Sequence, residues 1–599
     1  MKHFRILLLS ILSIAFITSC KKAVPKQTAF IPKNALFVAT INTKSLQSKL
    51  VKSQATIENI IRSISGSDTA VNKGKQEWED LKASGIDLDE NFYLAIDQIG
   101  GGMTTGKGST ITSAIGGLKD AAKLEAYIKK KDPASEVRKE KDYSYATVKG
   151  DNIVAWGKDV VIMMSYQRSM SPNDMIYDST SGSFNLANPG NSTAELKKQL
   201  DNNFNLKEDE TVAAIPEFRD LMQEKADASM WVNSTSSIEN LPIPLPKAKE
   251  LFANSFTAAK IDFEDGKISI GSRSYYSKEL RDILKNYTGP TADLGLIEHY
   301  PSDNIDGFAV FSFNPEVING IVKYLEVGGV VDSYLTKMMG TNYTLQQALK
   351  AIKGDFAIVV SDLAIKPATD TSTRMMPGSM PDFKMLMNIP VGDKTQMNRL
   401  MDKLVEMQML VKTNNEYRLN TNMQRLGYQL RVDDKNVFIA SDENLLNQYK
   451  TGSKKININN QVMSDFKGKS AVSYVNIESI LNGINTSATR QANSVLPKAK
   501  ETFKDMEAYS ENFNGKYLEG HAIVHFKNEK ENSLTSLLSF IETVSKNVKT
   551  NPAMVGNDDD VQIDTVFSDP HGHVRAGEDV QVDTAYKKQS GMARSKKNK

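Results

Sequence analysis

A glycine-rich segment comes close to a phosphate-binding loop. It runs Gly101-Gly-Met-Thr-Thr-Gly106-Lys107-Gly108-Ser109. A P-loop places Ser or Thr directly after its Lys to hold Mg²⁺, and a helix then begins with its N-terminus facing the phosphates. Here Gly108 follows Lys107, and the next residues favour a strand. We therefore predict a flexible hairpin loop, in which Gly101 and Lys107 are candidate partner contacts, rather than a nucleotide site.

A second loop, residues 363–382, is rich in methionine. Met375, Met376 and Met380 lie in it, and soft thioether sulfur can bind Cu(I). No His or Cys accompanies them, and Met also forms adaptable apolar contact surfaces. We treat these three residues as candidate partner contacts, with copper binding and an uninvolved loop as the alternatives.

The six His residues do not predict a metal centre. His521 and His525 would share one strand face about 13 Å apart, which is too far for one ion. No HExxH, Gly-x-Ser-x-Gly or Rossmann glycine pattern occurs. A hydrolytic site made of two paired carboxylates is still an alternative, because 72 acidic residues offer many pairs and spacing alone cannot choose one. We expect no cofactor, no metal and no enzymatic activity, with a carboxylate-based hydrolase as the alternative.

The first residues have the pattern of a bacterial lipoprotein signal peptide. Lys2 and Arg5 precede an apolar run of 13 residues, shorter than the roughly 20 that span a bilayer. The run ends in Ile17-Thr18-Ser19-Cys20, and Cys20 is the only Cys in the chain. We expect residues 1–19 to be removed, Cys20 to carry palmitate-type acyl chains that anchor the protein to the membrane, and residues 20–30 to form a tether. The polar tether lacks an acidic cluster, which favours the periplasmic side of the outer membrane.

The composition is that of a soluble globular protein rather than a nucleic-acid binder. The 599 residues (66.3 kDa) include 74 Lys and Arg against 72 Asp and Glu, a balance that argues against nucleic acid as a partner. Apolar residues make up 40% and charged residues 24%, close to globular averages. The length predicts more than one domain.

The body of the chain contains two related halves, residues 31–286 and 300–547. Segments recur in the same order at offsets of roughly 240 to 280 residues. The pairs are 32–42 with 301–314, 91–97 with 355–361, 109–115 with 383–389, 118–130 with 394–411, 160–164 with 436–440, 228–233 with 471–476, and 267–271 with 520–524. Segments 118–130 and 394–411 are predicted to be helices. Preserved order favours a tandem, diverged duplication. Each half mixes strand hairpins with amphipathic helices, which predicts an α+β fold with mainly antiparallel sheet and packed helices.

This order of features resembles a known family. A lipobox, a strand opening of the Pro32-Lys-Asn-Ala type and two diverged halves are similar to a bacterial envelope lipoprotein family that carries a domain-of-unknown-function label (4836). The resemblance covers roughly residues 20–545. It implies an envelope lipoprotein, and it transfers no activity and no catalytic residues.

The C-terminal residues 548–599 are predicted to be a disordered tail, because they lack sustained apolar periodicity. Two copies of an Asp-Val-Gln-(Ile/Val)-Asp-Thr motif begin 19 residues apart, at Asp560 and Asp579. Their alternation suits a peptide that adds to a sheet edge, and a short duplication without a role is the alternative. The candidate contact residues are Val561, Ile563, Phe567, Val580, Val582 and Tyr586. Basic residues from Lys587 onward could contact anionic lipid.

Together these patterns predict a membrane-anchored envelope lipoprotein that acts by binding, with an envelope protein or anionic lipid as the partner. A periplasmic ligand-binding lipoprotein with an apolar or glycan pocket between the halves is the first alternative. A carboxylate-based hydrolase is the second.

Overall fold

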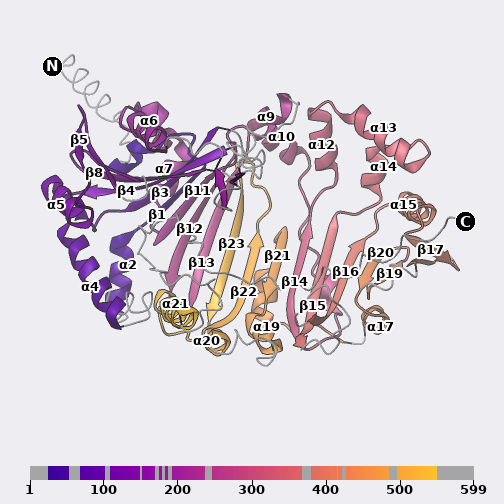
Figure 1. Cartoon of the computed structure of the whole chain (residues 1–599). Coiled ribbons are helices and arrows are strands. Elements are labelled where there is room, and N and C mark those ends of the chain that lie inside the picture. Colours follow the sequence, from indigo (N-terminus) through magenta and orange to yellow (C-terminus); the bar gives the residue numbers. More distant parts are fainter. Residues whose placement is uncertain are drawn as a thin grey trace, which may run out of the picture. The chain divides into compact units, whose positions relative to one another are not determined.

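The body is built around one continuous antiparallel sheet of 19 strands (Figure 1). The structure is a computed structural model that describes residues 24–52, 68–100, 108–148, 152–168, 175–178, 183–186, 192–235, 246–366, 380–414, 416–420, 427–452, 454–484 and 495–549. The predicted α+β class with mainly antiparallel sheet is confirmed. The described residues all belong to one compact unit of the chain, and the predicted tail after residue 549 lies outside the described residues.

The strands of the first half are β1 (Phe37–Ile41), β2 (Ile86–Asp87), β3 (Phe92–Gly100), β4 (Gly108–Leu118), β5 (Val137–Lys139), β6 (Ser144–Val148), β7 (Asn152–Trp156), β8 (Val160–Arg168), β9 (Met175–Asp178), β10 (Ser183–Leu186), β11 (Ala228–Asn233), β12 (Phe256–Glu264) and β13 (Lys267–Tyr275). Its α-helices are α2 (Thr43–Lys52), α4 (Asp68–Ala83), α5 (Ala121–Lys131), α6 (Ser192–Phe204), α7 (Pro216–Gln223), α9 (Pro246–Phe252) and α10 (Lys278–Asn286). Short 3₁₀ turns η1 (Lys26–Phe30), η5 (Glu208–Glu210) and η6 (Val212–Ala214) complete it.

The strands of the second half are β14 (Ile305–Ser312), β15 (Asp355–Lys366), β16 (Met380–Pro390), β17 (Leu410–Thr413), β18 (Glu416–Leu419), β19 (Gln429–Val432), β20 (Asn436–Ala440), β21 (Ala471–Val475), β22 (Phe503–Ser510) and β23 (Tyr517–Phe526). Its helices are α11 (Gly295–Glu298), α12 (Glu316–Tyr324), α13 (Gly328–Met339), α14 (Leu345–Lys350), α15 (Lys394–Glu406), α17 (Glu443–Thr451), α18 (Asn460–Asp465), α19 (Ile477–Gly483), α20 (Val495–Thr502) and α21 (Ser533–Lys549).

The two halves pair their strands in the same order. In the first half the order is β8-β4-β3-β1-β11-β12-β13, and in the second it is β20-β16-β15-β14-β21-β22-β23. β13 then pairs antiparallel with β23, so that the last strands of the two halves join them into one sheet. Gly271 lies opposite His521 in this register. We call the β13–β23 pairing the seam.

Equivalent helices start in the same way in both halves. The Asp120 side chain accepts backbone N–H bonds at the start of α5, and Asp393 does so at the start of α15. Asp is a preferred N-cap because its carboxylate satisfies the free N–H groups of the first turn. The sequence predicted a helix over 394–411, but α15 ends at Glu406 and Leu410 already begins β17.

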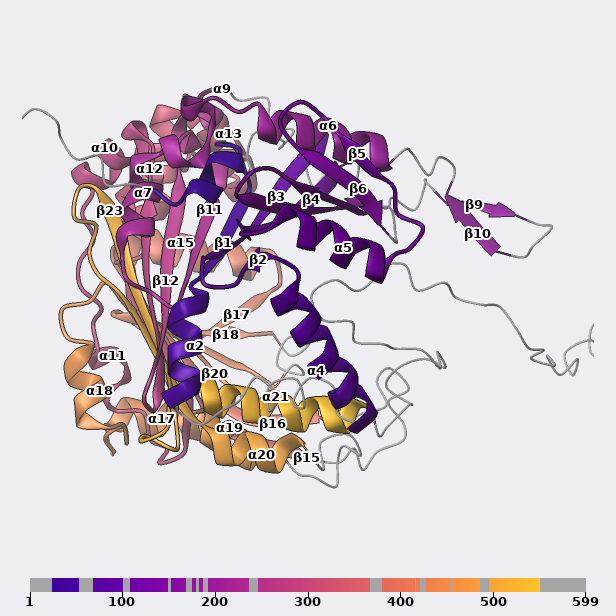
Figure 2. The same ribbon diagram turned by 90° about the vertical axis from the view of Figure 1, so that its left-hand side faces the viewer.

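Each half buries one face of its part of the sheet under helices. In the first half Val38, Trp231 and Phe218 meet in a buried core, with Phe218 edge-on to Trp231. In the second half Phe308 and Tyr474 stack within the corresponding core. Figure 2 shows α7 and α11 on this side of the sheet, while α2 and α21 lie on the other side. In the described part of the chain no helix is both long and apolar enough to cross a membrane.

Candidate functional site

One face of the sheet carries no charged side chain over its central strands. Residues on a strand alternate between the two faces, and the pairing registers show which residues of neighbouring strands share a face. We call the face that does not pack on the two cores the apolar sheet face. From β3 to β15 it consists of Phe92, Leu94, Ile96, Gln98, Phe37, Ala39, Ile41, Ala228, Met230, Val232, Thr257, Ala259, Ile261, Phe263, Ile268, Ile270, Ser272, Ser274, Leu518, Gly520, Ala522, Val524, Met506, Ala508, Ser510, Ala471, Ser473, Val475, Gly307, Ala309, Phe311, Phe356, Ile358 and Val360.

This face stays accessible although it is apolar. Ile41, Leu94 and Phe311 are 45%, 38% and 38% exposed, and nearly all of the other residues on the face are only partly buried. Their strand neighbours on the opposite face, such as Tyr93 and Val310, are fully buried. Soluble proteins rarely expose large contiguous apolar patches, and such patches mark sites of interaction. The apolar sheet face is therefore the candidate functional site.

The apolar sheet face continues across the seam without interruption. Ile268 of β13 lies opposite Val524 of β23, and Ile270 lies opposite Ala522. All four side chains are partly buried. The two halves thus share one uncharged surface rather than two surfaces divided by polar side chains.

The opposite face of the seam is polar and titratable. His525 Nδ1 lies 2.7 Å from Asp505 Oδ1, and burial raises the pKa of the neighbouring Glu507. His521 stacks on Tyr509 with ring centroids 4.9 Å apart. Both His residues lie on β23, as predicted. Among the described residues, no cluster of His, Cys, Asp and Glu has the arrangement to hold a metal ion.

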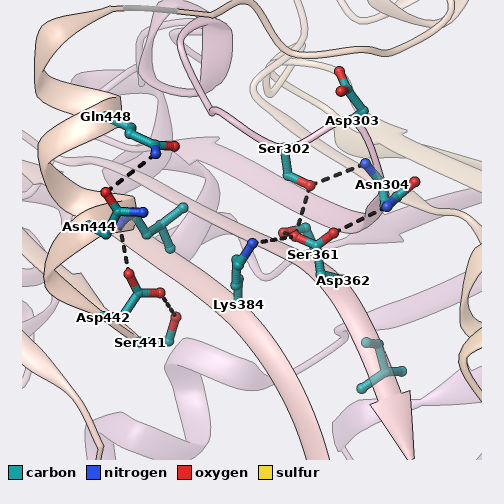
Figure 3. A network of polar contacts seen from close by, with 12 residues as sticks. Ser302, Asp303, Asn304, Ser361, Asp362, Lys384, Ser441, Asp442, Asn444 and Gln448 are labelled. Atoms are coloured by element: carbon teal, nitrogen blue, oxygen red, sulfur yellow. Dashed lines mark hydrogen bonds and ion pairs between the residues drawn. The ribbon is translucent and has the colours of Figure 1, made fainter.

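A network of polar contacts joins the residues that precede β14 to strand β15, near the start of the second half (Figure 3). Asp362 has φ of 56° at a point where the register of β15 shifts. Its carboxylate accepts hydrogen bonds from Ser302 Oγ at 2.9 Å, Ser361 Oγ at 3.0 Å and Asn304 Nδ2 at 3.2 Å, and Lys384 Nζ lies 3.2 Å away. Burial opposes the ionised form, yet these bonds hold the pKa of Asp362 below its usual value. The network fixes a strained turn, which is a structural role.

Two pockets lie away from the apolar sheet face. One of about 430 Å³ is lined by residues of the first half, including Lys33, Tyr276 and Arg281. Another of about 490 Å³ is lined by residues of the junction and the second half, including Pro290 and Asp355. Neither draws residues from both halves, so neither corresponds to the pocket between the halves that the sequence suggested.

Most residues singled out from the sequence lie outside the described residues. These are Cys20, Gly101, Lys107, Met375, Met376, Val561, Ile563, Phe567, Val580, Val582 and Tyr586. Met380 is the first residue of β16, but its side chain is not described. The backbone around the glycine-rich loop agrees with a hairpin, because Gly100 pairs with Gly108 and a strand, not a helix, follows.

The candidate site was not predicted from the sequence, because no charged, metal-ligating or nucleophilic side chain marks it. A signal was present: strands such as Phe37-Val-Ala-Thr-Ile41 and Phe356-Ala-Ile-Val-Val360 carry apolar residues at both parities. Such runs belong to strands whose two faces both avoid water. What the pattern does not show is that the described helices cover one face only in part, so that Ile41, Leu94 and Phe311 remain exposed there.

Comparison with known proteins adds little. No family model and no curated protein sequence matches the chain. Three crystal forms of a protein called TP0453 are similar in part, each covering 43% of this chain. Crystal form IV has 9% identity, a TM-score of 0.22 and 83% of its own chain covered, and form I has 10%, 0.21 and 80%. At these TM-scores the likeness supports no conclusion about fold or function.

Proposed function

We propose that the chain is a non-enzymatic envelope lipoprotein, anchored through acylated Cys20, that binds an apolar ligand on its apolar sheet face. The observation that carries the proposal is the accessible, uncharged surface around Ile41, Leu94 and Phe311. Burial of apolar area from water supplies roughly 25 cal/mol per Å². A hydrocarbon ligand brings no polar group of its own that would need a hydrogen-bond partner on this uncharged surface.

The proposal replaces the predicted pocket between the halves with an open surface that both halves share. The most extensively bonded acid of the network in Figure 3, Asp362, holds a structural turn, which favours a binding role over a hydrolytic one at that position. Asp362 accepts bonds from Ser302, Ser361 and Asn304. Two further predictions from the sequence are not tested by the structure. They are an envelope protein as the partner, and contact of the basic C-terminal residues with anionic lipid.

A binding titration with a fluorescent 16-carbon fatty acid tests the proposal. The chain from Lys21 onward, which keeps every described residue, should bind it saturably. The double variant Ile41→Lys, Phe311→Lys should weaken binding at least tenfold, because each ammonium would lose hydration under a hydrocarbon chain.

The matched control is Tyr334→Lys on α13, where the side chain is 69% exposed but lies off the apolar sheet face. It should leave the affinity unchanged. No saturable binding by the unmodified chain, or equal weakening by the control, would show that the apolar sheet face is not the ligand site.

A further inference from the structure

We infer that the pocket of about 430 Å³ in the first half binds a short peptide through its two charged termini. The inference goes beyond the proposed function, because this pocket lies away from the apolar sheet face and would take a charged ligand. It follows from side chains of both charges that line the pocket without an oppositely charged partner.

Packed elements of the first half form the walls of this pocket. The walls are the segment before β1, the start of α7, the turn between α9 and β12, the end of β13 and the start of α10. Phe218 anchors α7 in the core, edge-on to Trp231. Ser277 anchors α10, because its hydroxyl donates to the Leu251 carbonyl at 2.6 Å and accepts the Leu280 N–H at 3.0 Å. The pocket is therefore held open by the fold.

Four charged side chains in the pocket have no ion-pair partner among the described residues. They are Lys33, Glu217, Glu279 and Arg281. The Arg281 guanidinium donates to the backbone carbonyl of Tyr276 at 3.1 Å, which leaves its charge uncompensated. The other charged residue of the wall, Lys278, has a partner, because its Nζ lies 3.9 Å from Asp282.

The unpaired charges indicate a ligand that carries both signs. Glu217, Glu279 and Arg281 are only partly exposed, and a charge that loses hydration on folding is normally compensated by a partner. Here two cations and two anions share one pocket without pairing with each other. A ligand of one sign would be attracted by one pair and repelled by the other, whereas a zwitterion compensates both.

The rest of the wall suits an apolar body between the charged ends of the ligand. Phe256, Tyr275 and Tyr276 line the pocket, and aromatic rings pack well against other rings and apolar groups. A short peptide has an ammonium at one end, a carboxylate at the other and side chains between them. A fatty acid lacks the ammonium, and a neutral glycan lacks both charges.

Isothermal titration calorimetry of the chain from Lys21 onward with the tripeptide Ala-Phe-Ala tests the inference. We expect saturable binding of one tripeptide per chain. Acetylation of its N-terminus or amidation of its C-terminus should each weaken binding about tenfold, because each removes a charge-assisted hydrogen bond. Free phenylalanine, whose two charges lie on one carbon atom, should bind more weakly than the tripeptide.

Two double variants assign the charges to the two ends of the peptide. Glu217→Gln with Glu279→Gln should weaken binding of the free tripeptide about tenfold and leave the affinity for the acetylated form unchanged. Lys33→Gln with Arg281→Gln should do the same for the free and amidated forms. The matched control is Asp220→Asn with Lys285→Gln, which changes exposed charges of α7 and α10 outside the pocket and should have no effect.

Several results would overturn the inference. These are no binding of the tripeptide by the unmodified chain, capped forms or free phenylalanine that bind as tightly as the tripeptide, or equal weakening by the control. The capped peptides are tested on the unmodified chain, so this part does not depend on the folding of any variant, and circular dichroism melting checks the variants. The fatty-acid titration of the apolar sheet face is a separate measurement, so the proposed function stands or fails independently.

Discussion

Asp97 on β3 is a buried carboxyl whose ionisation should set how the stability of the body depends on pH. It is 6% exposed, and its Oδ2 has no hydrogen-bond partner among the described residues. Burial alone raises its pKa from 3.8 to about 7. In the repeated pattern its position corresponds to Ser361 of β15, whose hydroxyl is paired with Tyr300 at 2.9 Å. The first half therefore carries an acid where the second half carries a satisfied neutral group.

The sign of the effect follows from proton binding. Between pH 4 and pH 7 the folded chain keeps a proton on Asp97 that the unfolded chain has released, so the free energy of unfolding falls as pH rises through this window and levels off above it. A difference of about three pKa units corresponds to ~4 kcal/mol. Asp97→Asn stays neutral at every pH. It should exceed the parent in stability by up to ~4 kcal/mol at pH 8 and by about zero at pH 4.

Urea unfolding at pH 4, 6 and 8 measures this difference. Asp97→Ser introduces the residue found at the equivalent position of the second half. Its stability relative to the parent should change with pH in the same way as that of Asp97→Asn. Its free energy of unfolding should be lower than that of Asp97→Asn at every pH, because the shorter side chain leaves a small void. A stability gain of Asp97→Asn that is equal at pH 4 and pH 8, or absent at both, would refute the argument that Asp97 is buried without compensation.

Two other substitutions test carboxylates that hold loops and strands together through hydrogen bonds and ion pairs. Asp362→Ala should lower the free energy of unfolding by ~1–3 kcal/mol at pH 7, because Ser302 and Lys384 lose their acceptor. The pKa of Asp362 is depressed in the folded chain. Urea titrations should therefore show this loss of stability shrinking as the pH falls below about 4. Asp227, 1% exposed, pairs with Lys49 and accepts a 2.6 Å bond from the Phe263 N–H. Asp227→Ala should cost ~3–5 kcal/mol by leaving a partly buried cation unpaired, and an unchanged thermal midpoint would contradict this.

The order of strands and helices could be predicted from the sequence because it depends on local patterns. Segments 91–97 and 355–361 lie on the equivalent strands β3 and β15 apart from residue 91, which precedes β3. Segments 228–233 and 471–476 coincide with β11 and β21 apart from the last residue of the second segment. The helix expected to reach residue 411 was too long, because the exposed Met407 and Met409 continue a helical pattern while the chain turns into β17.

The candidate site could not be predicted, because it depends on how completely each face of the sheet is covered by packed helices. Alternation places Leu94 and Tyr93 on opposite faces. It does not reveal that Tyr93 is buried in a core while Leu94 is 38% exposed. The joining of the halves is likewise a long-range pairing. No local feature of β13 predicts that it pairs with β23, 250 residues later in the chain.

The seam has the geometry of a contact between identical subunits. When the pairings are followed outward from β11 and β21, Gly271 and His521 occupy the same position of the repeat, and at the seam they lie opposite each other. A strand that meets its own counterpart in antiparallel register is the pattern of an isologous, two-fold interface. Here it lies within a single polypeptide, so its two sides are free to diverge, and a glycine facing a histidine marks where they differ.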